Sequence, residues 1–261
     1  DYMRISITDR CNLRCRYCMP DGITQVSMAE ILTYEEIRKV CILAAELGIQ
    51  KIKITGGEPL MRKGCGDLIR GIREIPGVET ITMTTNGVLL ENYGKQLKEA
   101  GVSMYHENIE TSEENFPNVC TTHSFEDKIH EIKRIQEAGL ELCTGGIVGM
   151  GETWKDRLSM AFTLAELGIR SIPINILIPV KGTPFGELEP MTQEDILRTV
   201  AILRYINPKA DVRIAAGRNY FKDGGGELFL SGINAALTGN LLTTGGSSME
   251  QDRNILEEKG Y

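Results

Sequence analysis

Three cysteines lie within eight residues near the start of the chain, at Cys11, Cys15 and Cys18. They follow an apolar, strand-like run at residues 3–8. Three thiolates this close can hold three irons of a cubane iron–sulfur cluster, and the fourth iron would then lack a protein ligand. An open iron suits an enzyme that binds a reagent at the metal. The spacing therefore predicts a [4Fe-4S] site with these three cysteines as its catalytic metal ligands.

Two other interpretations of the cysteines stay open at this point. A structural zinc site needs four nitrogen or sulfur ligands, and no second pair of ligands stands nearby in the sequence. The three thiols could also lie unligated in a loop. The chain has seven cysteines, an odd number, which in a reducing compartment favours metal ligation over disulfides.

The composition limits the expected partners. The chain has 29 basic and 36 acidic residues, a formal net charge of −7, and no cluster of lysine or arginine suited to a phosphate backbone. Nucleic acid is therefore not an expected partner. No apolar run of 18 residues and no signal-peptide pattern occurs, which predicts a cytoplasmic protein without a membrane partner.

The elements that must position the cysteines alternate between strand and helix along the chain. Helix starts are marked by a hydroxyl residue with a carboxylate three positions later, at Thr33, Thr153 and Thr192. Eight repeats of a strand followed by a helix predict a single α/β domain, residues 1–261. Its expected fold is a TIM-type (β/α)8 barrel with the chemistry at the carboxyl ends of the strands. The strand-like runs are residues 3–8, 51–55, 80–85, 103–109, 140–148, 171–178, 212–216 and 233–237.

The helix after Thr33 is expected to bury one apolar stripe and to end at Gly48. This pattern assigns Cys41 to the core rather than to a metal site. The stripe consists of Ile37, Val40, Cys41, Ala44 and Leu47.

The spacing Cys-x-x-x-Cys-x-x-Cys resembles that of the radical S-adenosylmethionine (SAM) superfamily. The resemblance implies SAM at the open iron, an electron donor such as flavodoxin or ferredoxin, and Tyr17 in the cofactor site. Members of the superfamily use a Gly-Gly-Glu segment to hold the amino group of SAM, and Gly56, Gly57 and Glu58 directly follow the second strand here. The glycines would let the backbone approach the ligand, and the carboxylate would accept from the ammonium group.

Two further strand ends carry candidate cofactor residues. Thr85 and Asn86 end the third strand with polar groups, although an ordinary Asn-Gly turn is the alternative. The glycine-rich segment 145–151 ends the fifth strand and would leave space for a planar ring, and superfamily members place adenine near such a stretch, here beside Ile147. Glu110, near the end of the fourth strand, could accept from ribose hydroxyls or could be a solvated carboxylate.

The resemblance to named families divides along the chain. Residues 1 to about 101 are similar to the GTP 3′,8-cyclases of molybdenum cofactor biosynthesis, and residues from about 105 onward resemble biotin synthases. This division predicts a composite chain, engineered or natural, with its join near residues 101–104. The cyclase-like segments are residues 8–20, 54–62 and 84–87, and the biotin-synthase-like segments are residues 105–112, 117–123, 143–153, 173–177, 180–184, 213–218 and 241–244.

The biotin synthase resemblance implies a substrate site and a second cluster. Asn108 and Asn175 match positions that contact dethiobiotin, and an amide offers a donor and an acceptor to its ureido group. Cys143 and Arg213 match two of the four ligands of an auxiliary [2Fe-2S] cluster. The other two ligands are cysteines of the second and third strands, which are absent here, so that cluster is expected to be weak or missing. Cys65 and Cys120 would replace them only if loops carried both inward.

The resulting hypothesis is a radical SAM sulfurtransferase most similar to biotin synthase, in which sulfur insertion is in doubt. It takes a small, dethiobiotin-like substrate, and the resemblance leaves room for a homodimer. Three alternatives stay open. One is a related maturase or mutase without an auxiliary cluster, another is a GTP 3′,8-cyclase-like enzyme, and the third is a chimera that binds ligands without turnover.

Overall fold

The computed structural model describes residues 2–18, 26–239 and 247–261, so the quoted residues 19–20 and 241–244 lie outside the described part. The chain divides into two compact units. The first consists of Asp1–Asn108 and Cys120–Cys143, and the second of Ile109–Val119 and Thr144–Tyr261. No helix in the described part of the chain is long and apolar enough to cross a membrane.

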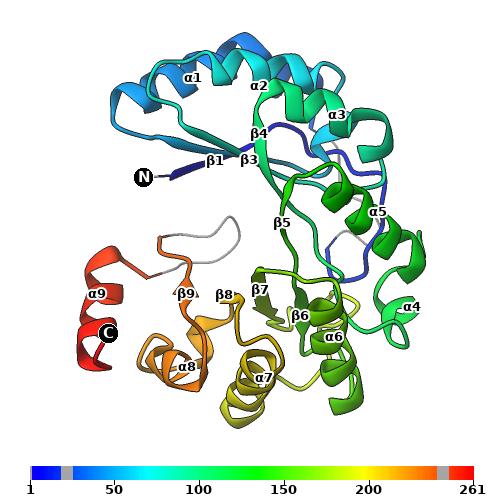
Figure 1. Ribbon diagram of the computed structural model, residues 1–261, viewed down its shortest axis with the longest axis vertical. Helices are drawn as coiled ribbons and strands as arrows, with labels where there is room; N and C mark the ends of the chain where they lie inside the picture. Colours follow the sequence, from blue (N-terminus) through cyan, green and yellow to red (C-terminus); the bar gives the residue numbers. More distant parts are fainter. Residues whose placement is uncertain (1, 19–25, 240–246) are drawn as a thin grey trace. The chain divides into compact units, whose positions relative to one another are not determined.

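The first unit is built on five parallel strands that pair in chain order. Figure 1 shows helices α1 (Tyr34–Glu46), α2 (Cys65–Arg73) and α3 (Leu90–Ala100) along one side of these strands. Register places His106 beside both Thr84 and Cys143, so the carboxyl ends of β3, β4 and β5 lie level. The strands are β1 (Tyr2–Ser6), β2 (Lys51–Thr55), β3 (Thr80–Thr84), β4 (Val102–His106) and β5 (Glu141–Cys143), and the helices are η1 (Met28–Glu30), α1 (Tyr34–Glu46), η2 (Pro59–Met61), α2 (Cys65–Arg73), α3 (Leu90–Ala100) and α5 (Phe125–Glu137).

The core of the first unit explains why these segments form strands and helices. Ile52 and Ile54 of β2 and Ile81 of β3 are fully buried, as expected for parallel strands covered by helices. Helix α1 starts at the predicted capping box, in which Thr33 and Glu36 satisfy each other's backbone N–H groups.

The predicted stripe of α1 is only partly correct. Ile37, Cys41 and Ala44 are buried, but Val40 is 43% exposed and Leu47 is 86% exposed. The three buried residues recur at intervals of four and three and form one narrow face, whereas Leu47 is already the C-cap. The helix ends before Gly48, which has a φ of +91°.

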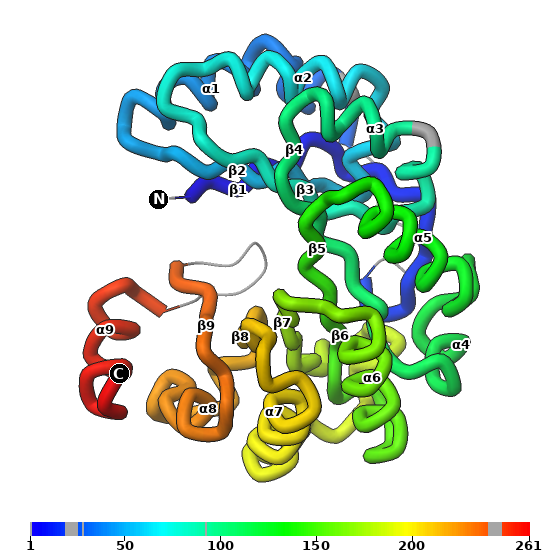
Figure 2. The backbone as a smooth tube through the Cα atoms, in the orientation of Figure 1, coloured from blue at the N-terminus to red at the C-terminus, as the bar shows by residue number. Residues whose placement is uncertain are grey.

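The second unit repeats the parallel β/α pattern. Its strands β6, β7, β8 and β9 pair side by side, and in Figure 2 α6, α7 and α8 lie along one side of β6, β7 and β8. Helices α6 and α7 begin after Thr153 and Thr192, as predicted. The elements are α4 (Phe116–Val119), β6 (Gly146–Val148), α6 (Trp154–Glu166), β7 (Ser171–Ile176), α7 (Gln193–Ile206), β8 (Asp211–Ala216), η3 (Arg218–Tyr220), α8 (Gly226–Ser231), β9 (Ala235–Ala236) and α9 (Met249–Glu258).

The α/β class and the positions of the predicted strands are confirmed, with two differences. The run at residues 140–148 is two strands, β5 and β6, rather than one. A Cβ at Gly145, between them, would lie 1.7 Å from the carbonyl oxygen of Pro173. The chain therefore approaches β7 too closely there for any residue but glycine. The last run, residues 233–237, contains a strand of only two residues.

Candidate functional site

The loop after β1 is fixed to the end of β2 by backbone hydrogen bonds. The N–H of Gly57 donates to the carbonyl of Thr8, and the N–H of Glu58 donates to that of Arg10, each over 2.7 Å. A Cβ at Gly57 would lie 2.4 Å from the Arg10 carbonyl oxygen, and one at Gly56 would lie 2.6 Å from that of Thr8. Both glycines are therefore required by the approach of the loop's own backbone, a reason that differs from the predicted approach of a ligand.

Cys11, Cys15 and Cys18 all lie in this loop, in the described part of the chain. Cys11 and Cys15 are half-buried, Cys18 is exposed, and Tyr17 is half-buried in the turn between Cys15 and Cys18. A backbone hydrogen bond of 3.0 Å from Cys18 N to Cys15 O closes that turn. Within the described residues, no three His, Cys, Asp or Glu side chains are close enough together to hold a metal ion. The structure thus brings the three thiols into one short loop without gathering them around a single point.

Glu58 is a buried acceptor at the end of β2. It is 1% exposed, and its carboxylate accepts from Leu60 N at 2.9 Å, from Thr85 Oγ1 at 2.9 Å and from Asn86 N at 2.7 Å. Burial raises the pKa of this carboxyl, while the three hydrogen bonds lower it. The carboxylate is directed to the end of β3, where it links the predicted Gly-Gly-Glu and Thr-Asn segments.

Asn86 connects Glu58 to the cysteine loop. Its side-chain Nδ2 donates to Asn12 Oδ1 at 2.8 Å and lies 3.8 Å from Cys11 Sγ. Burial raises the pKa of the Cys11 thiol, and the contacts from Leu13 N and Asn86 lower it. The predicted cofactor residues Glu58, Thr85 and Asn86 therefore form one connected group that ends at a predicted cluster ligand.

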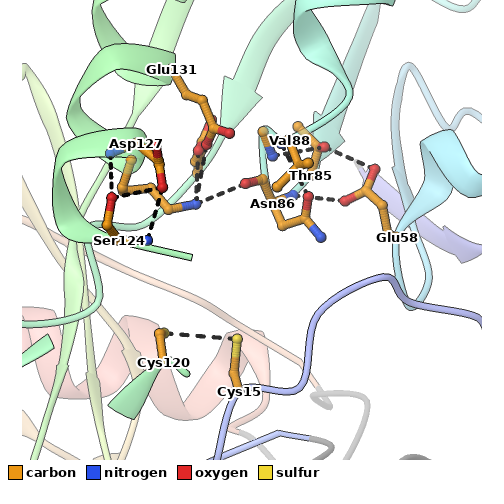
Figure 3. Close-up of polar contacts among 12 residues, drawn as sticks. Cys15, Glu58, Thr85, Asn86, Val88, Cys120, Ser124, Asp127 and Glu131 are labelled. Atoms are coloured by element: carbon orange, nitrogen blue, oxygen red, sulfur yellow. Dashed lines mark hydrogen bonds and ion pairs between the residues drawn. The ribbon is translucent and has the colours of Figure 1, made fainter. Parts of the chain in front are cut away.

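A buried ion cluster supports Asn86 from the other side. Lys128 of α5 is almost fully buried and donates to the carbonyl of Asn86 at 2.8 Å and to Glu107 Oε1 at 2.9 Å. A second carboxylate, Glu131, lies 3.7 Å from the same ammonium group. Figure 3 shows this chain of contacts from α5 to Glu58. The sequence motifs assign no role to Lys128 or Glu107: Lys128 belongs to no motif, and Glu107 lies in the biotin-synthase-like segment 105–112 without a function assigned to it.

The two carboxylates of this cluster share one cation. Burial, followed by the charge of Glu107, raises the pKa of Glu131 to about 8. A Cβ at Gly87 would lie 2.2 Å from Glu107 Oε1 and 2.5 Å from Glu131 Oε2, so only glycine fits against the pair. A cavity of about 700 Å³ adjoins the cluster and is lined by Asn12, Gly87 and Glu131, among others. In the Asn-Gly turn after β3, Asn86 therefore makes hydrogen bonds, and Gly87 allows the two carboxylates to pack against the turn.

Two other cysteines lie near the strand ends of the first unit. Cys120 is buried, and its sulfur is 3.8 Å from that of Cys15. Cys143, at the end of β5, is buried with its sulfur 3.3 Å from Nδ1 of His106. Cys65 begins α2 and lies in the core, where burial raises the pKa of its thiol to about 12. Cys65 and Cys120 are thus in separate environments rather than side by side.

In the second unit, three predicted ligand residues are neighbours through their backbones. Ile147 of β6 is the register partner of Asn175 of β7. The N–H of Ile147 also donates to the carbonyl of Glu110 at 2.8 Å. The structure therefore places the expected ribose, adenine and substrate residues of this unit on adjacent chain segments.

Glu110 adopts a backbone conformation that few residues other than glycine tolerate. Its φ is +66°, the one positive φ outside glycine within residues 2–18, 26–239 and 247–261. Such a conformation costs roughly 1–3 kcal/mol and is common at ligand sites. The side chain is 8% exposed, so the alternative of a solvated carboxylate does not describe it.

The glycines beside Ile147 also serve the protein's own packing. A Cβ at Gly146 would lie 2.4 Å from the sulfur of Met160 and 2.7 Å from the Glu110 carbonyl oxygen. The space predicted for a planar ring is therefore occupied, at Gly145 and Gly146, by neighbouring protein atoms.

The remaining predicted residues differ in their surroundings. Asn108 carries a buried side-chain oxygen that accepts no hydrogen bond from the described protein atoms, as expected of a group that awaits a ligand. Arg213 of β8 donates to Ser171 Oγ at 3.1 Å. Arg213 is therefore held in part by its neighbouring strand, and the sulfur of Cys143 lies beside the His106 ring.

Comparisons with known proteins identify the family. The pattern of the radical SAM superfamily matches residues 5–164, and that of the biotin and thiamin synthesis associated domain matches residues 173–261. A biotin synthase of Clostridium beijerinckii is 46% identical over 256 residues, which are 97% of this chain and 81% of the relative. A biotin synthase of Alkaliphilus metalliredigens is 44% identical over 97% of this chain and 80% of its own length.

The chain belongs to the biotin synthase family. It is accordingly a biotin-synthase-like radical SAM enzyme, and membership implies a [4Fe-4S] cluster, SAM, a small-molecule substrate and a redox partner. The alternative of a chimera without turnover is not supported. Biotin synthases align with 97% of the chain, so the join predicted near residues 101–104 is not needed to account for its first part.

Solved structures confirm the fold expected of a biotin synthase. The crystal structure of HydG, a maturase of the [FeFe]-hydrogenase, superposes with a TM-score of 0.77 at 20% identity, over 100% of this chain and 63% of that one. Methylornithine synthase superposes with a TM-score of 0.74 at 17% identity, over 99% of this chain and 80% of that one. The parallel strands therefore form the (β/α) barrel fold of the radical SAM superfamily.

The residues of this family member fit an iron–sulfur cluster by donor type. Three thiols lie in one short loop, and Asn86 places an amide N–H next to the sulfur of Cys11, a contact that stabilises a cluster thiolate. The orphaned oxygen of Asn108 similarly fits a polar ligand. Sequence motifs alone could locate Cys11, Glu58 and Asn86, but not the buried cation that supports them.

Proposed function

We propose that this biotin synthase homologue holds a [4Fe-4S] cluster through Cys11, Cys15 and Cys18. Its 46% identity to a biotin synthase supports the assignment, and the link from Glu58 through Asn86 to Cys11 is the observation that carries it. When bound, the cluster and SAM supply one-electron cleavage of the sulfonium and a hydrogen-abstracting radical. The chain itself keeps the thiol loop in place, through the hydrogen bonds of Gly57 and Glu58 to the loop backbone.

The residues proposed to contact SAM are the predicted ones: Tyr17, Gly56, Gly57, Glu58, Thr85 and Asn86, with Glu110 for the ribose and Ile147 for the adenine. The adjacency of Glu110 and Ile147, together with the strained backbone of Glu110, supports their shared role.

The proposed substrate is dethiobiotin or a similar small aliphatic molecule with a ureido group. Asn108 and Asn175 would bind that group, since each amide offers both a donor and an acceptor. The buried, unsatisfied oxygen of Asn108 supports this role. Conversion of dethiobiotin to biotin also needs a sulfur donor.

The cluster assignment is tested by Cys15→Ala after anaerobic reconstitution. The variant should lose the iron–sulfur charge-transfer absorption together with SAM cleavage to 5′-deoxyadenosine. Cys41→Ala is the matched control, because Cys41 is equally a cysteine but lies in the apolar core. Retained cleavage in Cys15→Ala would contradict the assignment.

The role of Glu110 is tested by the dissociation constant of SAM. Glu110→Ala should weaken SAM binding by roughly 1–3 kcal/mol, the scale of a lost charge-assisted hydrogen bond. Glu114→Ala is the control, because Glu114 is exposed and belongs to the same segment of the second unit. Equal affinities of the two variants would remove Glu110 from the site.

The auxiliary cluster is proposed to be absent. Strands β2 and β3 contain no cysteine, so two of the four ligands that the family supplies are missing. Reconstituted protein should therefore carry about four irons per chain, and SAM consumption with dethiobiotin should be uncoupled from biotin formation. About six irons per chain, a [2Fe-2S] signal lost in Cys143→Ala and stoichiometric biotin would together show that the second cluster forms.

The missing strand cysteines favour a second candidate, a radical SAM mutase or maturase reaction without sulfur insertion. A biotin synthase that lacks its sulfur donor and a mutase or maturase would both release 5′-deoxyadenosine without forming biotin. The two candidates are separated by analysing the products for a rearranged form of the substrate.

The proposal also includes a single barrel domain, a homodimer, a cytoplasmic location and a flavodoxin or ferredoxin as electron donor. The GTP 3′,8-cyclase likeness of residues 1 to about 101 stays a prediction, tested by incubation with GTP.

A further inference from the structure

Cys15 and Cys120 are 105 positions apart in the sequence, yet their sulfurs lie 3.8 Å from each other. Both belong to the first unit, and Figure 3 shows the two side chains directed toward one another. Cys120 is 2% exposed, whereas Cys15 is half-buried in the cysteine loop. A small molecule can therefore reach Cys15 more easily than Cys120.

Two other cysteines of the same unit provide a contrast. Cys41 and Cys65 pack in the apolar core, where burial raises the pKa of their thiols to about 11 and about 12. A thiol in such a place is rarely ionised and reacts slowly, because the thiolate is the nucleophile. Cys41 and Cys65 thus serve as internal references for the pair.

We propose that Cys15 and Cys120 form a reversible disulfide in the apoprotein. A disulfide needs a sulfur–sulfur distance of about 2.05 Å, so the two sulfurs must approach by about 1.8 Å, a change within the reach of side-chain rotation in a loop. All seven cysteines lie in the described part of the chain as thiols.

The oxidant is a low-molecular-weight disulfide such as glutathione disulfide. The thiolate of Cys15 attacks one sulfur of the oxidant, forming a mixed disulfide and releasing one glutathione thiolate. The thiolate of Cys120 then attacks the sulfur of Cys15 and releases the second glutathione. The two protein thiols lose two protons and two electrons in total, and glutathione disulfide is reduced to two glutathione molecules.

The consequence for the cluster rests on the proposed function. If Cys15 is a cluster ligand, its sulfur cannot be in the disulfide and on iron at the same time. The oxidised apoprotein would therefore be closed to iron until a thiol reductant opens the bond. Cys120 would act as a reversible protecting group for a ligand that is otherwise open to irreversible oxidation.

The experiment begins with metal-free protein treated anaerobically with glutathione disulfide and digested without reduction. Mass spectrometry should find the peptide that contains Cys15 joined to the peptide that contains Cys120, and dithiothreitol should separate them. Cys120→Ser and Cys120→Ala should instead retain glutathione on Cys15, whereas Cys41→Ser should form the same link as the wild type. Glutathione left on Cys15 in the wild type, or Cys15 joined to Cys11 or Cys18, would overturn the proposal.

Two further measurements separate this proposal from the cluster assignment. The thermal midpoint of the oxidised protein should be higher than that of the reduced protein, because the bond closes a long loop, and this difference should vanish in Cys120→Ala. Oxidised wild-type protein should take up iron and sulfide only after dithiothreitol is added. If the disulfide forms but cluster uptake proceeds without dithiothreitol, the role of Cys15 as ligand fails and the disulfide stands. If no disulfide forms while Cys15→Ala abolishes the cluster, the disulfide fails and the cluster assignment stands.

Discussion

At the ends of β2, β3 and β4 in the first unit, side chains of the predicted ligand residues hold one another in place, whereas the predicted ligand residues Glu110 and Ile147 of the second unit are joined through their backbones. In the first unit, Glu58, Asn86 and Lys128 form a continuous set of hydrogen bonds, most of it out of contact with water. In the second unit, Glu110 and Ile147 meet through a backbone hydrogen bond, and Glu110 has a positive φ.

This difference indicates where each unit is vulnerable. A buried charge network depends on every member, because removal of one charge leaves another without compensation in a medium of low polarity. A backbone arrangement tolerates side-chain replacement but depends on the φ that each residue can adopt. Substitutions should therefore have large, charge-dependent effects at Glu58 and Lys128 and small, conformation-dependent effects at Glu110.

The largest effect is expected for Lys128→Met. The substitution keeps the length of the side chain but leaves Glu107 and Glu131 facing each other, with Glu107 fully buried. Loss of one partner of a buried ion pair costs roughly 3–5 kcal/mol of unfolding free energy. Urea denaturation measures this loss.

The matched control for Lys128→Met is Lys155→Met in the second unit. Lys155 also pairs with a glutamate, Glu114, but both side chains are more than two-thirds exposed, at 77% and 68%. An exposed pair contributes at most about 1 kcal/mol. If Lys128→Met and Lys155→Met lost similar amounts of unfolding free energy, the buried ion pair would not contribute more to stability than the exposed one.

A smaller effect is expected for Glu58→Gln. The carboxylate accepts from three donors, and an amide would turn one of its N–H groups toward either Asn86 N or Leu60 N. An unsatisfied buried donor costs roughly 1–3 kcal/mol. The thermal midpoint should fall, and iron uptake should fall with it, since Asn86 would lose its anchor beside Cys11.

Glu79→Gln is the control for this substitution, because Glu79 is an exposed residue of the same unit whose carboxylate accepts a hydrogen bond from the Gln50 side chain. Its thermal midpoint and iron uptake should match those of the wild type. If the thermal midpoint and iron uptake of Glu58→Gln equalled those of the wild type, the hydrogen bonds from Glu58 through Asn86 would not be what holds the cysteine loop in place.

Local signals in the sequence predicted much of this architecture. The capping boxes at Thr33 and Thr153 depend on residues three positions apart, and both occur as predicted. The cysteine spacing and the Gly-Gly-Glu segment are also local, and they located the loop and the strand end that meet in the first unit.

The remaining features depend on residues that are distant in the sequence. The helical pattern of α5 does not distinguish Lys128 from the other polar residues of that helix. Its burial follows from contacts with Glu107 and Asn86, which lie on other elements. The approach of Cys15 to Cys120 spans 105 positions. The break between β5 and β6 likewise follows from contact with Pro173 of β7, which no pattern within residues 140–148 records.

A pH-dependent effect is expected at Glu131. Its pKa is raised from 4.5 to about 8, chiefly by burial and then by Glu107, with Lys128 acting in the opposite direction and Asp127 adding a small upward contribution. Between these values the folded state retains a proton that the unfolded state has released, so stability is full below about pH 4.5 and falls as the pH rises toward about 8. The slope from this group is at most about 1.4 kcal/mol per pH unit.

Glu131→Gln should remove that part of the pH dependence, because its amide stays neutral. Relative to wild type, the variant should gain stability at about pH 8 compared with about pH 5, by roughly 1–2 kcal/mol. Urea denaturation at the two pH values provides the measurement, with Glu126→Gln on the exposed side of α5 as control. Parallel pH profiles of Glu131→Gln and wild type would show that the pair with Glu107 holds no extra proton.

The smallest effect is expected in the second unit, at Glu110. Glu110→Ala and Glu110→Gly both remove the carboxylate, but alanine keeps the cost of a positive φ, whereas glycine adopts a φ of +66° without steric strain. Glycine also loses more backbone entropy on folding, which offsets part of the gain. The glycine variant should therefore be more stable than the alanine variant by about 1 kcal/mol or less. Both should bind SAM equally weakly, because affinity depends on the missing carboxylate and stability on the backbone. If alanine were the more stable of the two, the backbone at Glu110 would not be strained, and the contrast between Glu110 and the charge network of the first unit would fail.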